Sequence, residues 1–256
     1  MSRNQPPGGQ EPVVQRVRIR YAKRGPLRFT SHRDFARAFE RALQRAGVPI
    51  AYSQGFTPHP KISYASAAPT GVASEAEYLE IALRSRVDPD ELVRALDAAL
   101  SPGLDVLEAV EAGTGALADR IEASRWRIEL PGVEPAELRH AVDGFAAASE
   151  VLVERLTKQG RRTFDARGPV IHIGVAEPPS EVNDVRCAIL DLVIRQVTPS
   201  VRPDDVLSGL RVVAGLEPPV PPRATRLAQG TLTEQAEIAD PLRADRSGAV
   251  IGASPG

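Results

Sequence analysis

A short sequence pattern occurs twice in the chain and constrains the fold more than any other feature. It reads DPDELVRAL at 88–96 and RPDDVLSGL at 202–210. In each copy a proline and two acidic residues precede two aliphatic residues and a leucine at helical spacing. Proline and acidic residues at this place are typical of a helix N-terminus. We therefore expect the chain to contain two copies of one structural unit.

The segments around the first copy alternate between strand and helix patterns. An alternating stretch, VRIRY at 17–21, is typical of a strand. A helix is expected to follow Ser31, a favoured N-cap residue, and to end at Gly47. Its apolar face at helical spacing is Phe35, Ala38, Phe39, Ala42, Leu43 and Ala46. Further strands are expected at 62–67, 77–83 and 104–110, and a second helix from Asp88.

The second half repeats this order. Strands are expected at 126–130, 151–157, 187–197 and 224–229, and helices from Pro135 and over 202–210. The order β-α-β-β-α-β is that of the split β-α-β, or ferredoxin-like, arrangement. We predict an α+β fold of tandem ferredoxin-like units with antiparallel sheets, at 14–112 and 124–229. Residues 1–13 are expected to form a disordered arm and residues 230–256 a flexible tail.

Charge is distributed unevenly along the chain. Residues 1–64 contain twelve Lys or Arg against three acidic residues, a net charge of +9. The other 192 residues carry a net charge of −10, so the total of −1 hides the difference. The same first segment holds seven of the 11 aromatic residues. Basic charge with interleaved aromatics is typical of nucleic-acid binding, although a solvated charged face remains the alternative.

The predicted first helix carries a stripe of arginines. Arg33, Arg37, Arg41 and Arg45 recur every four residues, so their charges lie on one helix face. Such like charges repel, and phosphates or acidic side chains would neutralise them. At the start of this helix, Ser31 and Asp34 have the spacing of a capping box, and His32 lies between them. A solvated helix face and a packing role for His32 are the alternatives.

The segment YSQGFTPHPK at 52–61 is expected to be a stiff loop. Pro58 and Pro60 hold their neighbours in extended conformations, so Phe56, His59 and Lys61 would be presented at low entropic cost. The imidazole of His59 could stack on a base, bind a phosphate or transfer a proton. The alternative is a rigid connector with Phe56 in the core.

Together these segments give one predicted binding surface, on which we expect His32 and His59 to lie close together. Its candidate residues are Lys23, Ser31, His32, Arg33, Arg37, Arg41, Arg45, Tyr52, Phe56, His59 and Lys61. A polar hairpin around Gly160 offers a second basic contact. Its candidate residues are Lys158, Arg161 and Arg162, and a solvated hairpin is again the alternative.

The opening of the chain also resembles a known family. The stretch RYAKRGPLRFTSHRDFARAFERALQRAGVPIAYSQGFTPHPKISYASAAPTGVASEAEY is similar to the start of the radical SAM-linked protein family, a bacterial domain of unknown function. Members are often fused behind a cobalamin-binding radical SAM domain. The resemblance implies a radical SAM partner enzyme and an RNA-related setting. This chain lacks the cysteine triplet of a radical SAM domain.

Several classes of function are not expected. Cys187 is the single cysteine, which excludes an internal disulfide framework and a cluster of cysteine metal ligands. His32 and His59 would supply only two metal ligands, so no metal or other cofactor is expected. No apolar stretch is long enough to span a membrane and no signal peptide precedes the first strand, which favours a cytoplasmic protein.

Three hypotheses of function remain. The first is an RNA-binding accessory protein, for tRNA or rRNA, that presents its substrate to a radical SAM partner enzyme. The second is an enzyme that acts on RNA through Asp34, His32 or His59. The third is an adaptor whose basic face binds an acidic protein. Catalysis by this chain is the less favoured hypothesis, because signatures such as a Walker loop or a GxSxG motif are missing from the sequence.

Overall fold

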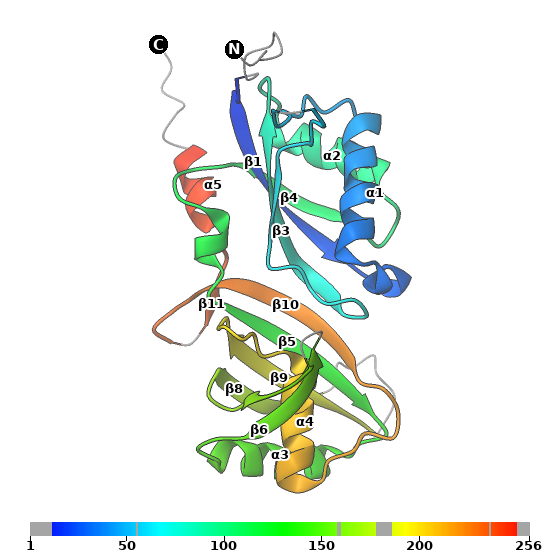
Figure 1. The fold of residues 1–256 in the computed structure, drawn as a ribbon, viewed down its shortest axis with the longest axis vertical. Coiled ribbons are helices and arrows are strands. Elements are labelled where there is room, and N and C mark those ends of the chain that lie inside the picture. The colour runs from blue at the N-terminus through cyan, green and yellow to red at the C-terminus, as the bar shows by residue number, and fades with distance from the viewer. Residues whose placement is uncertain (1–11, 55, 158–159, 178–185, 236, 250–256) are drawn as a thin grey trace, which may run out of the picture. The chain divides into compact units, whose positions relative to one another are not determined.

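Strands and helices alternate along the chain in the mixed α+β pattern expected from the sequence (Figure 1). The structure is a computed structural model that describes residues 12–54, 56–157, 160–177, 186–235 and 237–249. Its sheets are mostly antiparallel. The chain divides into two compact units, which are described separately below. Unit 1 comprises residues 1–71, 76–119 and 242–256, and unit 2 comprises 72–75 and 120–241.

Unit 1 contains the first predicted β-α-β-β-α-β order. Its elements are β1 (Gln15–Lys23), η1 (Gly25–Phe29), α1 (His32–Arg45), β2 (Ile62–Ala65), β3 (Ala73–Leu83), α2 (Pro89–Ala99), β4 (Val106–Glu111), η2 (Leu117–Arg120) and α5 (Arg243–Ala249). The strands are ordered β4-β1-β3-β2 across the sheet. The pairs β1–β4 and β2–β3 are antiparallel.

Alternation along β1 separates the core of unit 1 from its charged sheet face. Val17, Ile19 and Tyr21 are buried in the core, and Arg16, Arg18 and Arg20 alternate with them, on the opposite face. The predicted apolar face of α1 packs on this core, and the ring of Phe35 stacks on Tyr21 with centroids 4.3 Å apart. The helix ends beside Gly47, whose φ of +64° suits glycine at a helix terminus.

Unit 2 contains the second predicted order with one additional hairpin. Its elements are β5 (Ala123–Pro131), α3 (Pro135–Ala147), β6 (Leu152–Thr157), β7 (Gly160–Asp165), β8 (Val170–Ala176), β9 (Cys187–Arg195), α4 (Pro203–Ala214), β10 (Arg223–Leu232) and β11 (Ile238–Ala239). The strands are ordered β10-β5-β9-β8, and each neighbouring pair is antiparallel. The start of β3 adds a parallel pairing, with Ala73 opposite Thr225 of β10.

Helices α3 and α4 cover the apolar face of the unit 2 sheet. Trp126, Ile128 and Leu130 point to this side from alternate positions of β5. The two helices approach closely at Gly209, where an added Cβ would lie 2.6 Å from Cε2 of Phe145. Only glycine leaves room for this ring.

Two features of unit 2 correct the expected element positions. The segment 151–157 is a strand, but it pairs with β7 in a separate two-stranded sheet. The strand at the edge of the main sheet is β8, which the sequence pattern did not identify. Its apolar run is interrupted by His172 and Gly174, so it lacks a clear strand period.

The expected flexible tail at 230–256 is wrong for residues up to 249. Strand β10 continues to Leu232, β11 pairs with it, and α5 follows. The side chain of Leu242 is fully buried, and Asp245 is buried against Arg18 of β1. The N-terminal residues 1–11 lie outside the described residues, so the disordered arm stays a prediction. In the described part of the chain, no helix is long and apolar enough to cross a membrane.

Candidate functional site

The start of α1 is organised by a cap, as the sequence predicted. Ser31 has an extended backbone, and its Oγ accepts a hydrogen bond from the backbone N–H of Asp34 at 3.2 Å. The hydroxyl of Ser31 donates to Oδ2 of Asp34 at 2.6 Å. The ring of His32 is exposed and contacts Tyr64 edge-on, with centroids 4.8 Å apart. Ser31 and Asp34 thus satisfy each other, and His32 packs on β2.

Three of the four predicted arginines of α1 are exposed without an intramolecular partner. Within the described residues, the guanidinium groups of Arg33, Arg37 and Arg41 make no ion pair or side-chain hydrogen bond. Arg45 differs, because it donates to the carbonyl of Ala99 at the C-terminal end of α2. Its role is therefore to cap α2. The other three form the arginine stripe of α1.

The segment after α1 folds into a narrow antiparallel ribbon, here called the ribbon (residues 52–54 and 56–61). Tyr52 and Pro60 form an antiparallel bridge, and the N–H of Ser53 donates to the carbonyl of His59 at 2.8 Å. In return, the N–H of His59 donates to Oγ of Ser53 at 3.0 Å. Lys61 continues the pairing through Ala51 at 2.8 Å. The segment is a hydrogen-bonded extension rather than an irregular loop.

The ribbon exposes the side chain of Phe56 completely. Phe56 has a relative accessibility of 105%, so the alternative that placed it in the core is wrong. His59 is also exposed, whereas Tyr52 and Lys61 are half-buried near the base. A large apolar side chain without any packing partner gains nothing from folding of the chain.

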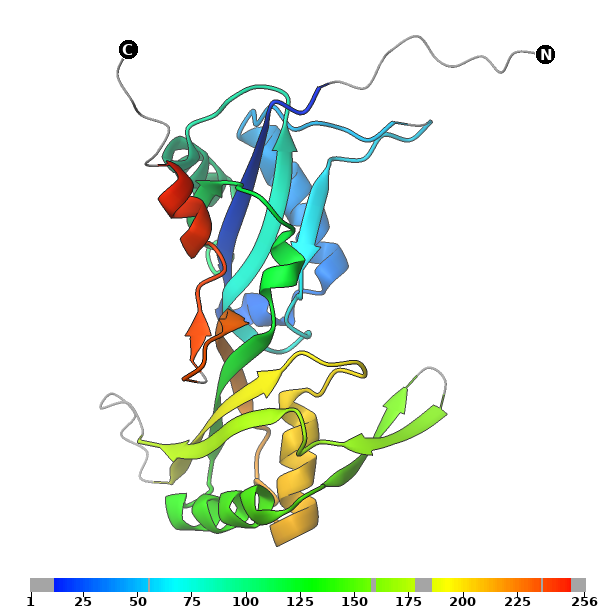
Figure 2. The same ribbon diagram turned by 90° about the vertical axis from the view of Figure 1, so that its left-hand side faces the viewer.

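His32 and His59 belong to different parts of unit 1. His32 lies in the first turn of α1, and the ribbon follows the other end of that helix, which has 14 residues. A helix of this length spans about 20 Å. Figure 2 shows the ribbon segment projecting at the end of unit 1 where α1 finishes. The rings of the two histidines make no contact in the described residues, so a single shared surface stays a prediction.

Lys23 has a structural role instead of the predicted binding role. Its side chain is buried, with a relative accessibility of 4%. The ammonium group donates to the carbonyls of Ala68 at 3.4 Å and Pro69 at 3.2 Å. Glu77 accepts from the N–H of Ala68 at 3.0 Å. Together the two charged residues hold the loop that follows β2, and Lys23 is not available to a ligand.

The predicted basic hairpin is formed by β6 and β7. Arg161 and Arg162 are exposed, whereas Lys158 lies outside the described residues. Arg161 is 3.5 Å from Glu154 in an exposed ion pair. Arg162 makes no ion pair or side-chain hydrogen bond in the part of the chain that the structure describes. The hairpin therefore offers two solvated cations.

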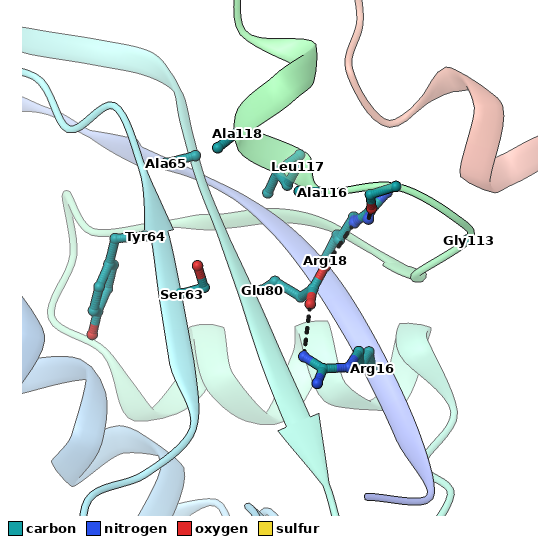
Figure 3. A pocket seen from close by; sticks show the side chains of 11 residues that line it. Arg16, Arg18, Ser63, Tyr64, Ala65, Glu80, Gly113, Ala116, Leu117 and Ala118 are labelled. Atoms are coloured by element: carbon teal, nitrogen blue, oxygen red, sulfur yellow. Dashed lines mark hydrogen bonds and ion pairs between the residues drawn. The ribbon is translucent and has the colours of Figure 1, made fainter.

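A pocket lined by both charged and small apolar residues on the charged sheet face of unit 1 was not predicted (Figure 3). Its volume is about 290 Å³, and it lies between β1, β2, β3 and the segment from Gly113 to Ala118. Glu80 accepts from Arg16 at 3.0 Å and from Nε of Arg18 at 2.9 Å. Burial opposes the charge of Arg18, but Asp245 and Glu80 outweigh it and raise the Arg18 pKa. The alternation QRVRIRYAK at 15–23 is the sequence signal for these arginines.

Comparison with known protein families identifies the family of this chain. Residues 16–203, most of the sequence, match a family described as "Uncharacterized protein conserved in bacteria (DUF2344)". The chain belongs to this family. The matched range includes α1, the ribbon and the hairpin β6–β7, so the candidate surfaces all lie within the family domain. No curated protein matches the sequence.

Similarity of this DUF2344 protein to solved structures is weak. One match is the first two RRM domains of the yeast poly(U)-binding protein Pub1, at 10% identity over 83% of this chain and 98% of that chain, with a TM-score of 0.23. Another is an encapsulated DyP-type peroxidase from Mycobacterium smegmatis, at 10% identity over 86% and 92%, with a TM-score of 0.21. Scores at this level support neither a fold nor a function.

The described residues of the family domain contain no group of three His, Cys, Asp or Glu side chains arranged to hold a metal ion. Each unit instead carries exposed basic features of its own. Unit 1 carries the arginine stripe of α1 and the exposed ribbon, and unit 2 carries the basic hairpin.

Proposed function

We propose that the chain is an RNA-binding accessory protein built from two ferredoxin-like units. The strand orders β4-β1-β3-β2 and β10-β5-β9-β8 support this fold assignment. Numbered within each unit, and with β6–β7 counted as an insertion, both orders become 4-1-3-2. Two interleaved β-α-β crossovers produce this order.

The observation that carries the RNA-binding proposal is the complete exposure of Phe56 on a hydrogen-bonded ribbon. A nucleobase stacked on an aromatic ring removes apolar surface from water, and such stacking tolerates any base. The pairing of Ser53 with His59, together with Pro58 and Pro60, reduces the entropy that the ribbon loses on binding. His59 adds a second ring that can stack or bind a phosphate.

The arginine stripe of α1 supplies the electrostatic component. Arg33, Arg37 and Arg41 repel each other in the free protein, because no acidic side chain pairs with them in the described residues. Phosphates of an RNA strand would neutralise this charge and release counterions. Guanidinium groups suit phosphate oxygens because of their planar donor geometry.

The contacts at the start of α1 favour binding over catalysis. Asp34 accepts a hydrogen bond from the hydroxyl of Ser31, and His32 packs on Tyr64, so the second hypothesis would require side chains that have structural roles. An accessory protein needs a partner enzyme. The proposal that this partner is a radical SAM protein rests on the family resemblance of the sequence alone.

Titration of the purified chain with labelled tRNA and rRNA fragments at two salt concentrations tests the proposal. We expect the affinity to fall steeply as salt increases, since phosphate contacts release counterions. Weak binding to every RNA at both salt concentrations would overturn the proposal. Salt-sensitive binding to an acidic protein, without affinity for RNA, would support the adaptor hypothesis instead.

A further inference from the structure

The hairpin β6–β7 occupies in unit 2 the position that the ribbon occupies in unit 1. The ribbon lies between α1 and β2, and the hairpin lies between α3 and β8. Strands β2 and β8 hold the same place in their sheets, at the edge next to β3 and β9. The two insertions are therefore equivalent in the internal repeat, although their sequences are not similar.

The base of the hairpin is held firmly on both strands. From β6, Arg155 forms an ion pair with the buried Asp205 of α4 at 2.8 Å, and its guanidinium lies 4.8 Å from the ring centroid of Phe164. At the end of β7, Asp165 accepts from the N–H groups of Val151, Arg167 and Gly168 at 2.8–2.9 Å. The rest of the hairpin projects from the body of unit 2 (Figure 2).

The projecting part combines an apolar side chain with cations. Leu156 has a relative accessibility of 79% and is paired with Arg161 across the hairpin, so their side chains lie on the same face. Arg162 is exposed and unpaired within the described residues. The exposed pair of Arg161 with Glu154 stabilises little and can open at low cost. Arg162 is registered with Arg155 and lies on the opposite face, so the guanidinium of Arg161 is the one beside Leu156. An exposed apolar side chain beside a guanidinium group, with a second guanidinium on the other face, resembles the combination of apolar and basic side chains in unit 1.

We propose that the hairpin β6–β7 is a second contact for single-stranded RNA, in which Leu156 packs under a sugar or base, Arg161 binds a phosphate beside it, and Arg162 binds a phosphate from the opposite face of the hairpin. This inference rests on the proposed function, because it assumes that unit 1 binds RNA. Each unit then contributes its own contact to the same RNA strand. Two tethered contacts raise the affinity for a long RNA through effective concentration, whereas a short RNA gains nothing from the tether.

The test compares the full chain with the double variant Arg161→Ala/Arg162→Ala. Both side chains are solvated, so the variant should fold normally. The control, Arg139→Ala/Arg211→Ala, removes the same charge from exposed positions on α3 and α4 of unit 2. The probes are labelled unstructured RNAs of about six nucleotides, near the site size of one domain, and about 40 nucleotides.

We expect the hairpin variant to bind the long RNA roughly twentyfold more weakly at 0.1 M salt. Two lost phosphate contacts also reduce the slope of log affinity against log salt by about 1.4. Affinity for the short RNA should change by about twofold or less, because the contact in unit 1 still holds it. The control variant should change neither affinity by more than about twofold.

The possible failures are distinguishable. If the unaltered chain binds the long RNA and the hairpin variant binds it equally well, the inference is wrong and the proposed function stands. An equal loss in the control variant also overturns the inference, since it would indicate a general effect of charge. If the unaltered chain binds neither RNA, both proposals fail.

Discussion

Arg18 and Asp245 lie at opposite ends of the sequence and form a buried ion pair in unit 1. Nη1 of Arg18 is 2.9 Å from Oδ2 and 3.0 Å from Oδ1 of Asp245, and each side chain has an accessibility of 1%. Asp245 also accepts from the N–H of Gly113 at 2.9 Å. The pair therefore joins α5, β1 and the segment after β4.

Removing Asp245 should destabilise the protein strongly. Asp245→Ala removes one of the two carboxylates that contact the buried guanidinium of Arg18, and breaking a buried ion pair by removing one partner costs about 3 kcal/mol or more. The free energy of unfolding in urea measures the loss. Glu111→Ala, which breaks an exposed pair with Arg86, should cost less than about 1 kcal/mol. Equal losses in the two variants would contradict the prediction.

Asp165 should contribute stability that depends on pH. Burial disfavours its charge, but the hydrogen bonds from Val151, Arg167 and Gly168 outweigh burial and lower its pKa below the ordinary 3.8. A carboxylate with a depressed pKa stabilises the folded state above its unfolded pKa, and this contribution disappears as pH falls through the folded pKa.

Asp165→Ala should therefore lower the free energy of unfolding by about 2 kcal/mol at pH 7. The difference from the unaltered protein should shrink as the pH falls below 3.8, the ordinary pKa of the carboxyl. Urea unfolding at pH 7, 5 and 3 measures this trend. A difference that is constant over this range would show that the carboxylate charge does not contribute.

Local signals explain why α1 and its cap could be predicted from the sequence. Ser31, Asp34 and the apolar spacing that begins at Phe35 act within one or two helical turns, so no distant residue is needed to identify them. The same is true of the Pro-Asp starts of α2 and α4. The repeat of these local signals also gave the order of most elements.

The features that could not be predicted depend on distant residues. Helix α5 is held by Arg18, more than 200 residues earlier in the chain. Lys23 was expected to bind a ligand as one of the basic residues of the first segment, and only the fold brings the carbonyls of residues 68–69 to its ammonium group. The exposure of Phe56 could not be predicted either, since an aromatic residue in a loop can pack into the core or project into solvent.

Phe56 should matter for binding and not for folding. Because its ring is fully exposed, Phe56→Ala should change the free energy of unfolding by less than about 0.5 kcal/mol. If one stacked base is lost, RNA binding should weaken by about 1–3 kcal/mol, with a change in preference among sequences. Phe35→Ala, which empties a buried site, should instead cost about 3–5 kcal/mol of stability. Unchanged RNA affinity for Phe56→Ala would remove the ribbon from the interface.

The arginine stripe should contribute affinity without sequence preference. Arg37→Ala and Arg41→Ala should each reduce the slope of log affinity against log salt by about 0.7 for single-stranded RNA. The reduction should be similar for RNAs of different sequence, because phosphates carry no sequence information. Arg94→Ala, at an exposed position of α2, is the matched control and should leave the slope unchanged. A loss confined to one RNA sequence would indicate a base contact instead.

The packing of α3 against α4 gives a prediction with an internal control, because each helix contains one glycine. At Gly209 an added Cβ would lie 2.6 Å from Cε2 of Phe145 and 3.2 Å from Cγ1 of Val151, so both side chains must move. Gly209→Ala should lower the free energy of unfolding by about 1–3 kcal/mol, as overpacked cores do. At Gly144 the nearest atom is Cγ2 of Val213 at 3.8 Å, an ordinary contact. Gly144→Ala should therefore stabilise the protein by about 0.5–1 kcal/mol, through the better helix propensity of alanine. Thermal and urea unfolding of both variants measure these changes, and a stabilising Gly209→Ala would show that the two helices can separate without loss of core packing.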